Sequence, residues 1–323
     1  MLKTKKRKWK LMSNFGSGKK NTLKVNTRKV GWKDTLIYEI MVAPATILFL
    51  LFTVYPFLAS IGYSFTNYSS NHLFDFKFVG LRNYLVVFTS ADTLGALKNS
   101  FIYAIWQTGL HVLFAIPLAV ILSNKKVRCK GFLRTGLYFP AVVSPLIVGY
   151  IWKFLLSTSY FGPINNVLKD AGLPIINFFG DPDLAMYVVI FTQVWQWTGY
   201  AVIIVVANIT NIPTDYYEAA NIDGASAWQK FRYITLPMLY PSVSFLLINS
   251  LLAGMKVYDI LVATTNFGPM NATNTAMGYI VNTAVGGGAM GLGSAFGVVF
   301  FLILFVFTKV FMFFLDKWEE KVQ

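Results

Sequence analysis

The sequence predicts an all-α integral membrane protein with six transmembrane helices, and three observations point to this class. First, 55% of the residues are hydrophobic and only 13% are charged, against about 25% charged in an average soluble domain. Second, six separate stretches are apolar enough to span a bilayer, which takes about 20 residues. Third, basic residues concentrate in alternate segments between these stretches, as in membrane proteins whose cytoplasmic segments carry the excess of Lys and Arg.

The six predicted spans cover residues 40–65, 101–122, 137–156, 185–209, 242–262 and 295–315. Pro44 and Pro56 interrupt the first span, and Pro140 and Pro145 interrupt the third. Proline is tolerated in membrane helices where neighbouring helices satisfy the carbonyls that it frees. We therefore expect kinked helices at these positions.

The charge distribution predicts the orientation of the chain. Residues 1–33 contain twelve of the 28 Lys and Arg residues and no Asp or Glu. Beside a hydrophobic span, such an arm indicates a cytoplasmic flank rather than a nucleic-acid site. The segment after the second span is also basic, with Lys125, Lys126, Arg128, Lys130 and Arg134. We therefore expect both termini in the cytoplasm, a basic arm over residues 1–35 and a six-helix domain over residues 36–323.

One segment between the fourth and fifth spans, residues 213–237, is too polar to cross a membrane. Pro213 is typical of a helix start, and Gly224 can end a short helix. Ser226 with Gln229 three residues later fits a capping box that opens a second helix, and Pro237 is expected to stop it. The segment therefore predicts two short helices on the cytoplasmic face. On these grounds alone, an ordinary amphipathic connector explains it equally well.

The same segment carries a resemblance to a known family. The run Glu218-Ala219-Ala220, followed by Asp223-Gly224-Ala225 and Leu236-Pro237, resembles the "EAA" loop of bacterial binding-protein-dependent importer permeases. Other stretches are similar to the carbohydrate and glycerol-phosphate members, and to their first permease subunit in particular: Phe78-Val79-Gly80-Leu81, Ile151-Trp152-Lys153, Gly162-Pro163-Ile164-Asn165 and Tyr258-Asp259. Gly268-Pro269 departs from the family pattern, which has a second glycine before the proline.

The resemblance implies a type I ABC importer permease in a bacterial cell membrane. Such a permease is not an enzyme: it forms half of a pore with a second, different permease, and two cytoplasmic ATPases bind ATP and Mg. An extracellular binding protein delivers the solute, here a sugar or oligosaccharide. The 323 residues contain no phosphate-binding loop of their own, and we expect no cofactor or metal in this chain. The residues that would dock on the ATPase are Glu218, Ala219, Ala220, Asp223, Gly224 and Ala225.

A candidate substrate path begins in the fourth span. Gln193, Trp197 and Tyr200 fall on one face of a helix there. Sugars bind through their apolar ring faces to aromatic side chains and through their hydroxyls to amides, so this face fits a carbohydrate. The same residues also fit an aromatic belt at the outer surface of the membrane.

The fifth span adds Asn249, Lys256, Tyr258 and Asp259 to the candidate path. Lys256 and Asp259 are three residues apart and could form an ion pair on one helix face. A charged wall of the substrate path is the sharper alternative. His111 in the second span is expected to be a hydrogen-bonded packing residue.

Three other functions remain open at this stage. The same architecture could import glycerol-phosphate or another acidic solute, which an unpaired Lys256 would favour. The chain could be a self-sufficient secondary transporter or channel, although such proteins carry more charge within their spans. A membrane enzyme is the most distant alternative, because the sequence has no cluster of His, Asp, Glu or Cys.

Overall fold

The computed structural model describes residues 32–70, 76–124 and 126–322. Most of the predicted basic arm therefore lies outside the described residues. The chain divides into two compact units, residues 1–56 and 57–323. In the first unit, α2 (Trp32–Phe49) contains Pro44 and continues into a π-helical segment, η1 (Leu50–Val54). The π turn directly precedes α3 (Tyr55–Tyr63), whose second residue is Pro56.

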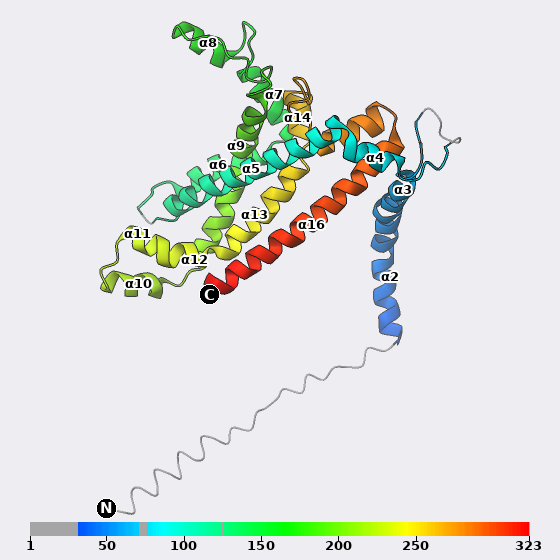
Figure 1. Ribbon diagram of the computed structural model, residues 1–323. Helices are drawn as coiled ribbons and strands as arrows, with labels where there is room; N and C mark the ends of the chain where they lie inside the picture. Colours follow the sequence, from blue (N-terminus) through cyan, green and yellow to red (C-terminus); the bar gives the residue numbers. More distant parts are fainter. Residues whose placement is uncertain (1–31, 71–75, 125, 323) are drawn as a thin grey trace, which may run out of the picture. The chain divides into compact units, whose positions relative to one another are not determined.

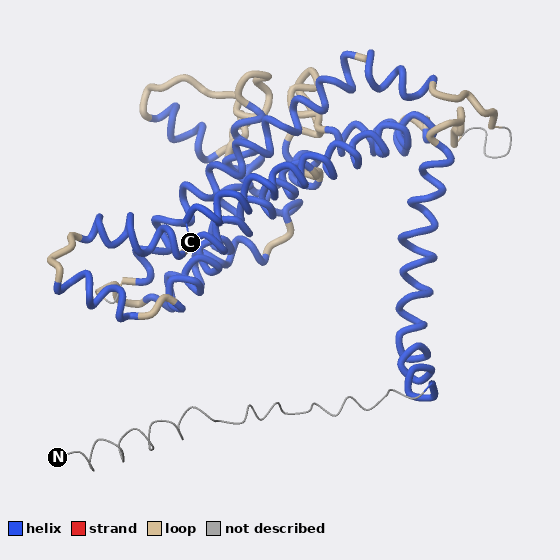
Figure 2. The backbone as a smooth tube through the Cα atoms, turned by 60° about the horizontal axis from the view of Figure 1, so that its bottom comes forward, coloured by secondary structure: helices blue, strands red, loops and turns tan. Residues whose placement is uncertain are grey.

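The second unit is built of helices joined by loops (Figures 1 and 2). After α3 come α4 (Arg82–Thr89), α5 (Ala91–Ser123), α6 (Lys130–Val142), α7 (Pro145–Leu155), α8 (Pro163–Asp170), α9 (Ala185–Asn211), α10 (Thr214–Ile222), α11 (Ala227–Lys230), η2 (Phe231–Thr235), α12 (Leu236–Met238), α13 (Tyr240–Met255), α14 (Asp259–Thr264), α15 (Ala276–Val281), η3 (Asn282–Gly286) and α16 (Met290–Val322).

The predicted all-α membrane class is confirmed. Among the described residues, four helices are long and apolar enough to cross a membrane, and the number rises to six if each of two bent helix pairs is one span. The four are Tyr38–Tyr63, Ala91–Ser123, Ala185–Asn211 and Met290–Trp318. These correspond to the predicted first, second, fourth and sixth spans.

The third predicted span is a bent pair. The axes of α6 and α7 meet at 98°, and Pro145 is the first residue of α7. The bend leaves the carbonyl of Val143 outside a helical hydrogen bond, and the side-chain Nε2 of Gln196 in α9 donates to it at 2.7 Å. The expected kink is therefore confirmed, and a neighbouring helix satisfies the freed carbonyl.

The fifth predicted span, residues 242–262, is wrong in its second half. Helix α13 ends at Met255, and a separate helix, α14, begins at Asp259. The break frees the carbonyl of Val257, which accepts a hydrogen bond from Thr275 Oγ1 at 3.2 Å. A side chain from a distant loop thus makes the break tolerable, and hydropathy gives no sign of it.

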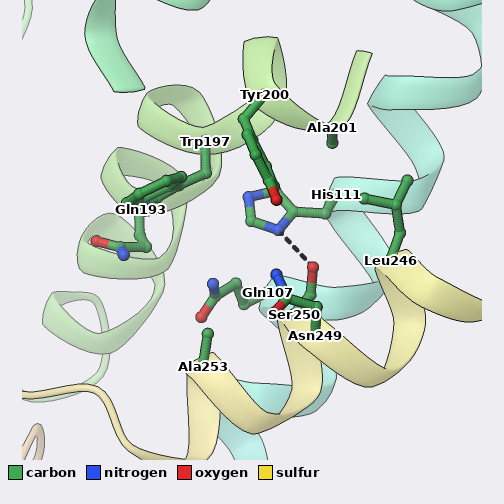
Figure 3. A pocket seen from close by; sticks show the side chains of 10 residues that line it. All are labelled: Gln107, His111, Gln193, Trp197, Tyr200, Ala201, Leu246, Asn249, Ser250 and Ala253. Atoms are coloured by element: carbon green, nitrogen blue, oxygen red, sulfur yellow. Dashed lines mark hydrogen bonds between the residues drawn. The ribbon is translucent and has the colours of Figure 1, made fainter. Parts of the chain in front are cut away.

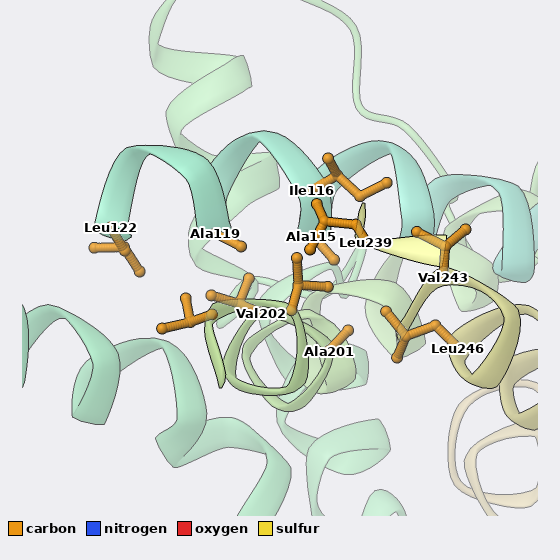
Figure 4. Packing of buried hydrophobic residues seen from close by; sticks show 11 residues of the cluster. Ala115, Ile116, Ala119, Leu122, Ala201, Val202, Leu239, Val243 and Leu246 are labelled. Atoms are coloured by element: carbon orange, nitrogen blue, oxygen red, sulfur yellow. The ribbon is translucent and has the colours of Figure 1, made fainter. Parts of the chain in front are cut away.

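The core of the second unit lies where α5, α9 and α13 pack side by side. Figure 4 shows Ala115 and Ala119 of α5 facing Val202 of α9, and Leu246 of α13 belongs to the same buried cluster. Gly254 brings α13 close to α5, because a Cβ there would lie 2.7 Å from the Cα of Ala104. Small residues allow such close approach between membrane helices. The segment α10–α12 and the C-terminus lie at one end of this bundle, and α7, α8 and α14 lie at the other (Figure 1).

Candidate functional site

A cavity of about 300 Å³ lies between α5, α9 and α13 (Figure 3). Its position follows from the packing described above, because all three helices that form the core contribute to its walls. The residues that line it are Gln107, His111, Gln193, Trp197, Tyr200, Ala201, Leu246, Asn249, Ser250 and Ala253.

The cavity combines unpartnered amides with aromatic rings. Gln107 is only 2% exposed. Its side-chain oxygen and that of Gln193 are buried, and neither has a hydrogen-bond partner among the residues that the structure describes. A buried polar atom without a partner costs free energy, which a ligand that donates a hydrogen bond recovers. The rings of Trp197 and Tyr200 lie edge to face, with centroids 5.9 Å apart.

Formal charge is absent from the walls of the cavity. Among the ten described residues that line it, none is Asp, Glu, Lys or Arg. His111 is buried, and its Nδ1 lies 3.2 Å from Ser250 Oγ, within hydrogen-bonding distance (Figure 3). The arrangement therefore offers hydrogen bonds and ring faces, which suit an uncharged ligand rich in hydroxyl groups.

The structure brings four of the sequence-predicted path residues together. Gln193, Trp197 and Tyr200 of α9 line the cavity with Asn249 of α13. They lie within the bundle, as expected for a ligand-facing surface. By contrast, Trp195 is 45% exposed and packs against Trp152, with ring centroids 5.5 Å apart. The belt interpretation fits Trp195 better than the three cavity residues.

The other three predicted path residues lie outside the cavity walls. Lys256 follows the last residue of α13, and Tyr258 precedes α14, which begins with Asp259. The expectation that Lys256 and Asp259 share one helix face is therefore wrong. Both are exposed. Within the described range 126–322, no ion pair joins them.

Sequence reasoning missed Gln107 and Ser250 as cavity residues. The signal was present for Gln107, because Gln107 and His111 are four residues apart in α5 and share a helix face. His111 was expected only to pack with a hydrogen bond. The hydrogen bond is present, with Ser250 as the partner, and His111 also lines the cavity, which was not expected.

The second candidate site is the segment α10–α11. Gly224 follows α10 with a φ of +75°, a conformation that glycine adopts without strain. Ser226 and Gln229 form the predicted capping box, with N–H···O distances of 3.3 and 2.7 Å. Two helices with a glycine turn between them are thus confirmed.

Side chains of this segment are largely exposed. Of the six predicted docking residues, Glu218, Ala219, Asp223 and Gly224 are exposed, and the other two, Ala220 and Ala225, are partly buried. Ile222 and Trp228 are 88% and 69% exposed, so they do not pack under the bundle. Phe231 does pack there, against the core cluster.

The second helix ends at Met238, one residue past the stop expected at Pro237. The helical segment runs from Ala227 to Met238 and meets α13 at an angle of 63°. A π-helical segment, η2 (Phe231–Thr235), precedes the proline, and Pro237 is the second residue of α12.

Comparisons with known proteins identify the family of this chain. Residues 85–321 match the family described as binding-protein-dependent transport system inner membrane component. The lactose transport system permease protein LacF of Rhizobium radiobacter is 33% identical, over 75% of this chain and 81% of its own length. The arabinooligosaccharides transport system permease protein AraP of Bacillus subtilis is 29% identical, over 88% of this chain and 91% of its own.

A solved structure shares the fold. It is a chain of a bacterial alginate ABC transporter, crystallised in complex with an alginate pentasaccharide-bound periplasmic protein. The two chains superpose with a TM-score of 0.74 at 24% identity, over 86% of this chain and 93% of the other. At this identity the match concerns the fold.

Proposed function

The chain belongs to the family of binding-protein-dependent transport system inner membrane components, and from this premise we propose that it is the permease subunit of an ATP-driven importer of sugars or oligosaccharides. The observation that carries the proposal is the cavity between α5, α9 and α13, in the middle of a membrane-spanning bundle. Its role is to bind the solute during passage.

The chemistry of the cavity favours a saccharide. The unpartnered oxygens of Gln107 and Gln193 accept hydrogen bonds from hydroxyl groups, and Trp197 and Tyr200 offer ring faces to the apolar side of a sugar. Ligand sites combine apolar walls with a few well-placed polar groups in this way. The lactose and arabinooligosaccharide permeases, which are 33% and 29% identical to this chain over the aligned residues, support the same class of solute.

The proposed assembly contains several further proteins. A second, different permease completes the pore, two cytoplasmic ATPases bind ATP and Mg, and an external binding protein supplies the solute. The α10–α11 segment faces the cytoplasm and docks on an ATPase through Glu218, Ala219, Ala220, Asp223, Gly224 and Ala225. Its exposure leaves it free for such a partner, and the small side chains permit close approach. This orientation also puts both termini in the cytoplasm of a bacterial cell.

Uptake of labelled saccharides by the complete complex in vesicles tests the proposal. Trp197→Leu removes a ring from the cavity and is expected to lower uptake at least tenfold. Trp195→Leu removes an exposed ring from the same helix outside the cavity and is expected to retain most of the uptake. Equal uptake by the two variants would contradict the role of the cavity.

An acidic or phosphorylated solute remains the second candidate. It rests on Lys256, which is exposed and has no ion-pair partner within residues 126–322. Asp259, also exposed, carries the opposite charge three positions along the chain, and the ten cavity-lining residues include no Lys or Arg. Inhibition of labelled-saccharide uptake by unlabelled neutral saccharides is compared with inhibition by phosphorylated ones. We expect the neutral saccharides to inhibit uptake.

A further inference from the structure

Helix α10 is attached to both walls of the cavity. On one side, only Ile212 and Pro213 separate it from α9, which carries Gln193, Trp197 and Tyr200. So short a connection transmits displacement of α10 to α9 directly. The second attachment is a side-chain contact to the segment that leads into α13, the opposite wall.

That contact is the hydrogen bond between the hydroxyls of Tyr217 and Thr235, which lie 2.9 Å apart. Thr235 is 7% exposed, and Tyr217 is partly buried. The Thr235 hydroxyl also donates to the carbonyl of Lys230, at 3.4 Å. Because a hydroxyl has one proton to donate, Tyr217 is then the donor in the bond to Thr235.

Thr235 lies between α11 and α13, where a displacement of α10 can be passed on to α13. It is the last residue of η2, the π-helical segment between α11 and α12. One residue, Leu239, then separates α12 from α13. Single π turns inside helices occur frequently at functional sites. Helix α13 carries Asn249, Ser250 and Ala253 into the cavity.

We propose that Tyr217 is a positioning residue that fastens α10 to the entrance of α13. Through this link, a displacement of α10 by a docked ATPase moves α13 together with α9, so both walls of the cavity respond at once. The proposal rests on the proposed coupling function of α10. Without the hydroxyl, α10 keeps only the turn at residues 223–226 and the hydrogen bond from Lys230 Nζ to Asn221 Oδ1, at 2.7 Å, as links to this segment. Both join α10 to α11 rather than to Thr235, so movement of the cavity then matches ATP hydrolysis less closely.

The test measures solute uptake and ATP hydrolysis together, in vesicles that contain the complete complex. Tyr217→Phe removes only the hydroxyl and is expected to lower the solute transported per ATP at least fivefold, while basal hydrolysis continues. Thr235→Val is expected to have the same effect, and the double variant is expected to be no worse than either single variant.

Matched controls are available beside each residue. Tyr216 is 53% exposed, and within residues 126–322 its hydroxyl makes no hydrogen bond. Tyr216→Phe is therefore expected to keep the ratio of uptake to hydrolysis. Thr235→Ser keeps the hydroxyl and loses the methyl group, and it is expected to retain coupling. If the methyl group mattered instead of the hydroxyl, Thr235→Ser would lose coupling and Thr235→Val, which keeps that methyl group, would retain it.

Two results would overturn the proposal. One is an unchanged ratio of uptake to hydrolysis in Tyr217→Phe. The other is additive losses in the double variant, which would show that the two hydroxyls act independently. If Tyr217→Phe reduces assembly, Thr235→Val carries the same test. Stimulation of ATP hydrolysis by the binding protein can be measured without knowing which solute is transported. This result therefore stays interpretable even if the solute is not a sugar. A complex that recruits no ATPase would instead refute the proposed function itself.

Discussion

Gly254 allows α13 to lie directly against α5, and this contact supports the cavity between them. A Cβ at this position would lie 2.7 Å from the Cα of Ala104 and 3.0 Å from the side-chain oxygen of Gln107. The Cα of Ala104 is part of the backbone of a long helix and cannot rotate away. The two helices must therefore separate to accommodate a methyl group. Gln107 is one of the cavity amides, and the same substitution therefore disturbs the site.

Gly254→Ala is expected to destabilise the protein by about 1–3 kcal/mol, as overpacking of a close contact does. The measurement is the midpoint of thermal unfolding of the purified complex in detergent. Gly109→Ala is the matched control, because this glycine lies in α5 with nothing within 4 Å of a built Cβ. It should leave the midpoint unchanged or raise it slightly, since alanine favours a helix. A lower midpoint only for Gly109→Ala would contradict the packing argument.

At the scale of the element, the turn after α10 can be compared with a second turn of the same geometry. Gly224 follows α10 with a φ of +75°, and Gly172 follows α8 with a φ of +74°. Neither has an atom within 4 Å of a built Cβ. A substitution at either glycine is therefore expected to cause the same local backbone strain. The two glycines lie at opposite ends of the bundle (Figure 1).

Gly224→Asp is expected to reduce transport strongly and to uncouple the stimulation of ATP hydrolysis, while the protein still inserts in the membrane. Gly172→Asp has the same backbone cost, about 1–2 kcal/mol for a left-handed residue, and is expected to retain coupling. Uptake, hydrolysis and the amount of membrane-inserted protein are measured for both variants. Normal transport by Gly224→Asp would refute a docking role for this turn.

At the scale of the whole molecule, the orientation of the chain in the membrane can be tested by labelling a cysteine. Cys129 is the only cysteine in the sequence, and its side chain is exposed. It lies between α5 and α6, in the basic segment that we place in the cytoplasm. A single exposed thiol can be labelled without removing any other.

A thiol reagent that does not cross membranes is expected to label Cys129 only after the cells are permeabilised. In a Cys129→Ser background, Thr158→Cys places a thiol at an exposed position after α7, and this variant is expected to be labelled in intact cells once any outer barrier is removed. Labelling is detected by mass spectrometry. The reverse pattern would invert the proposed orientation and remove the α10–α11 segment from the reach of any ATPase.

Sequence reasoning succeeded where the cause is local. The spans around α5, α9 and α16 follow from the length of apolar stretches, because lipid accepts no unsatisfied backbone. The capping box at Ser226 and the turn at Gly224 depend on residues within three or four positions of each other. Gln193, Trp197 and Tyr200, three of the seven predicted path residues, share the face of α9 that lines the cavity, because helical spacing sets which side chains share a face.

The tertiary structure decided the rest. The break between Met255 and Asp259 leaves the carbonyl of Val257 to a hydrogen bond from Thr275, and a π turn precedes Pro237. The cavity itself exists only because α5, α9 and α13 pack together and bring Gln107 toward Gln193. One amino-acid sequence specifies which residues each helix can present, but the contacts between helices determine which of those faces meet, since they join residues far apart in the chain.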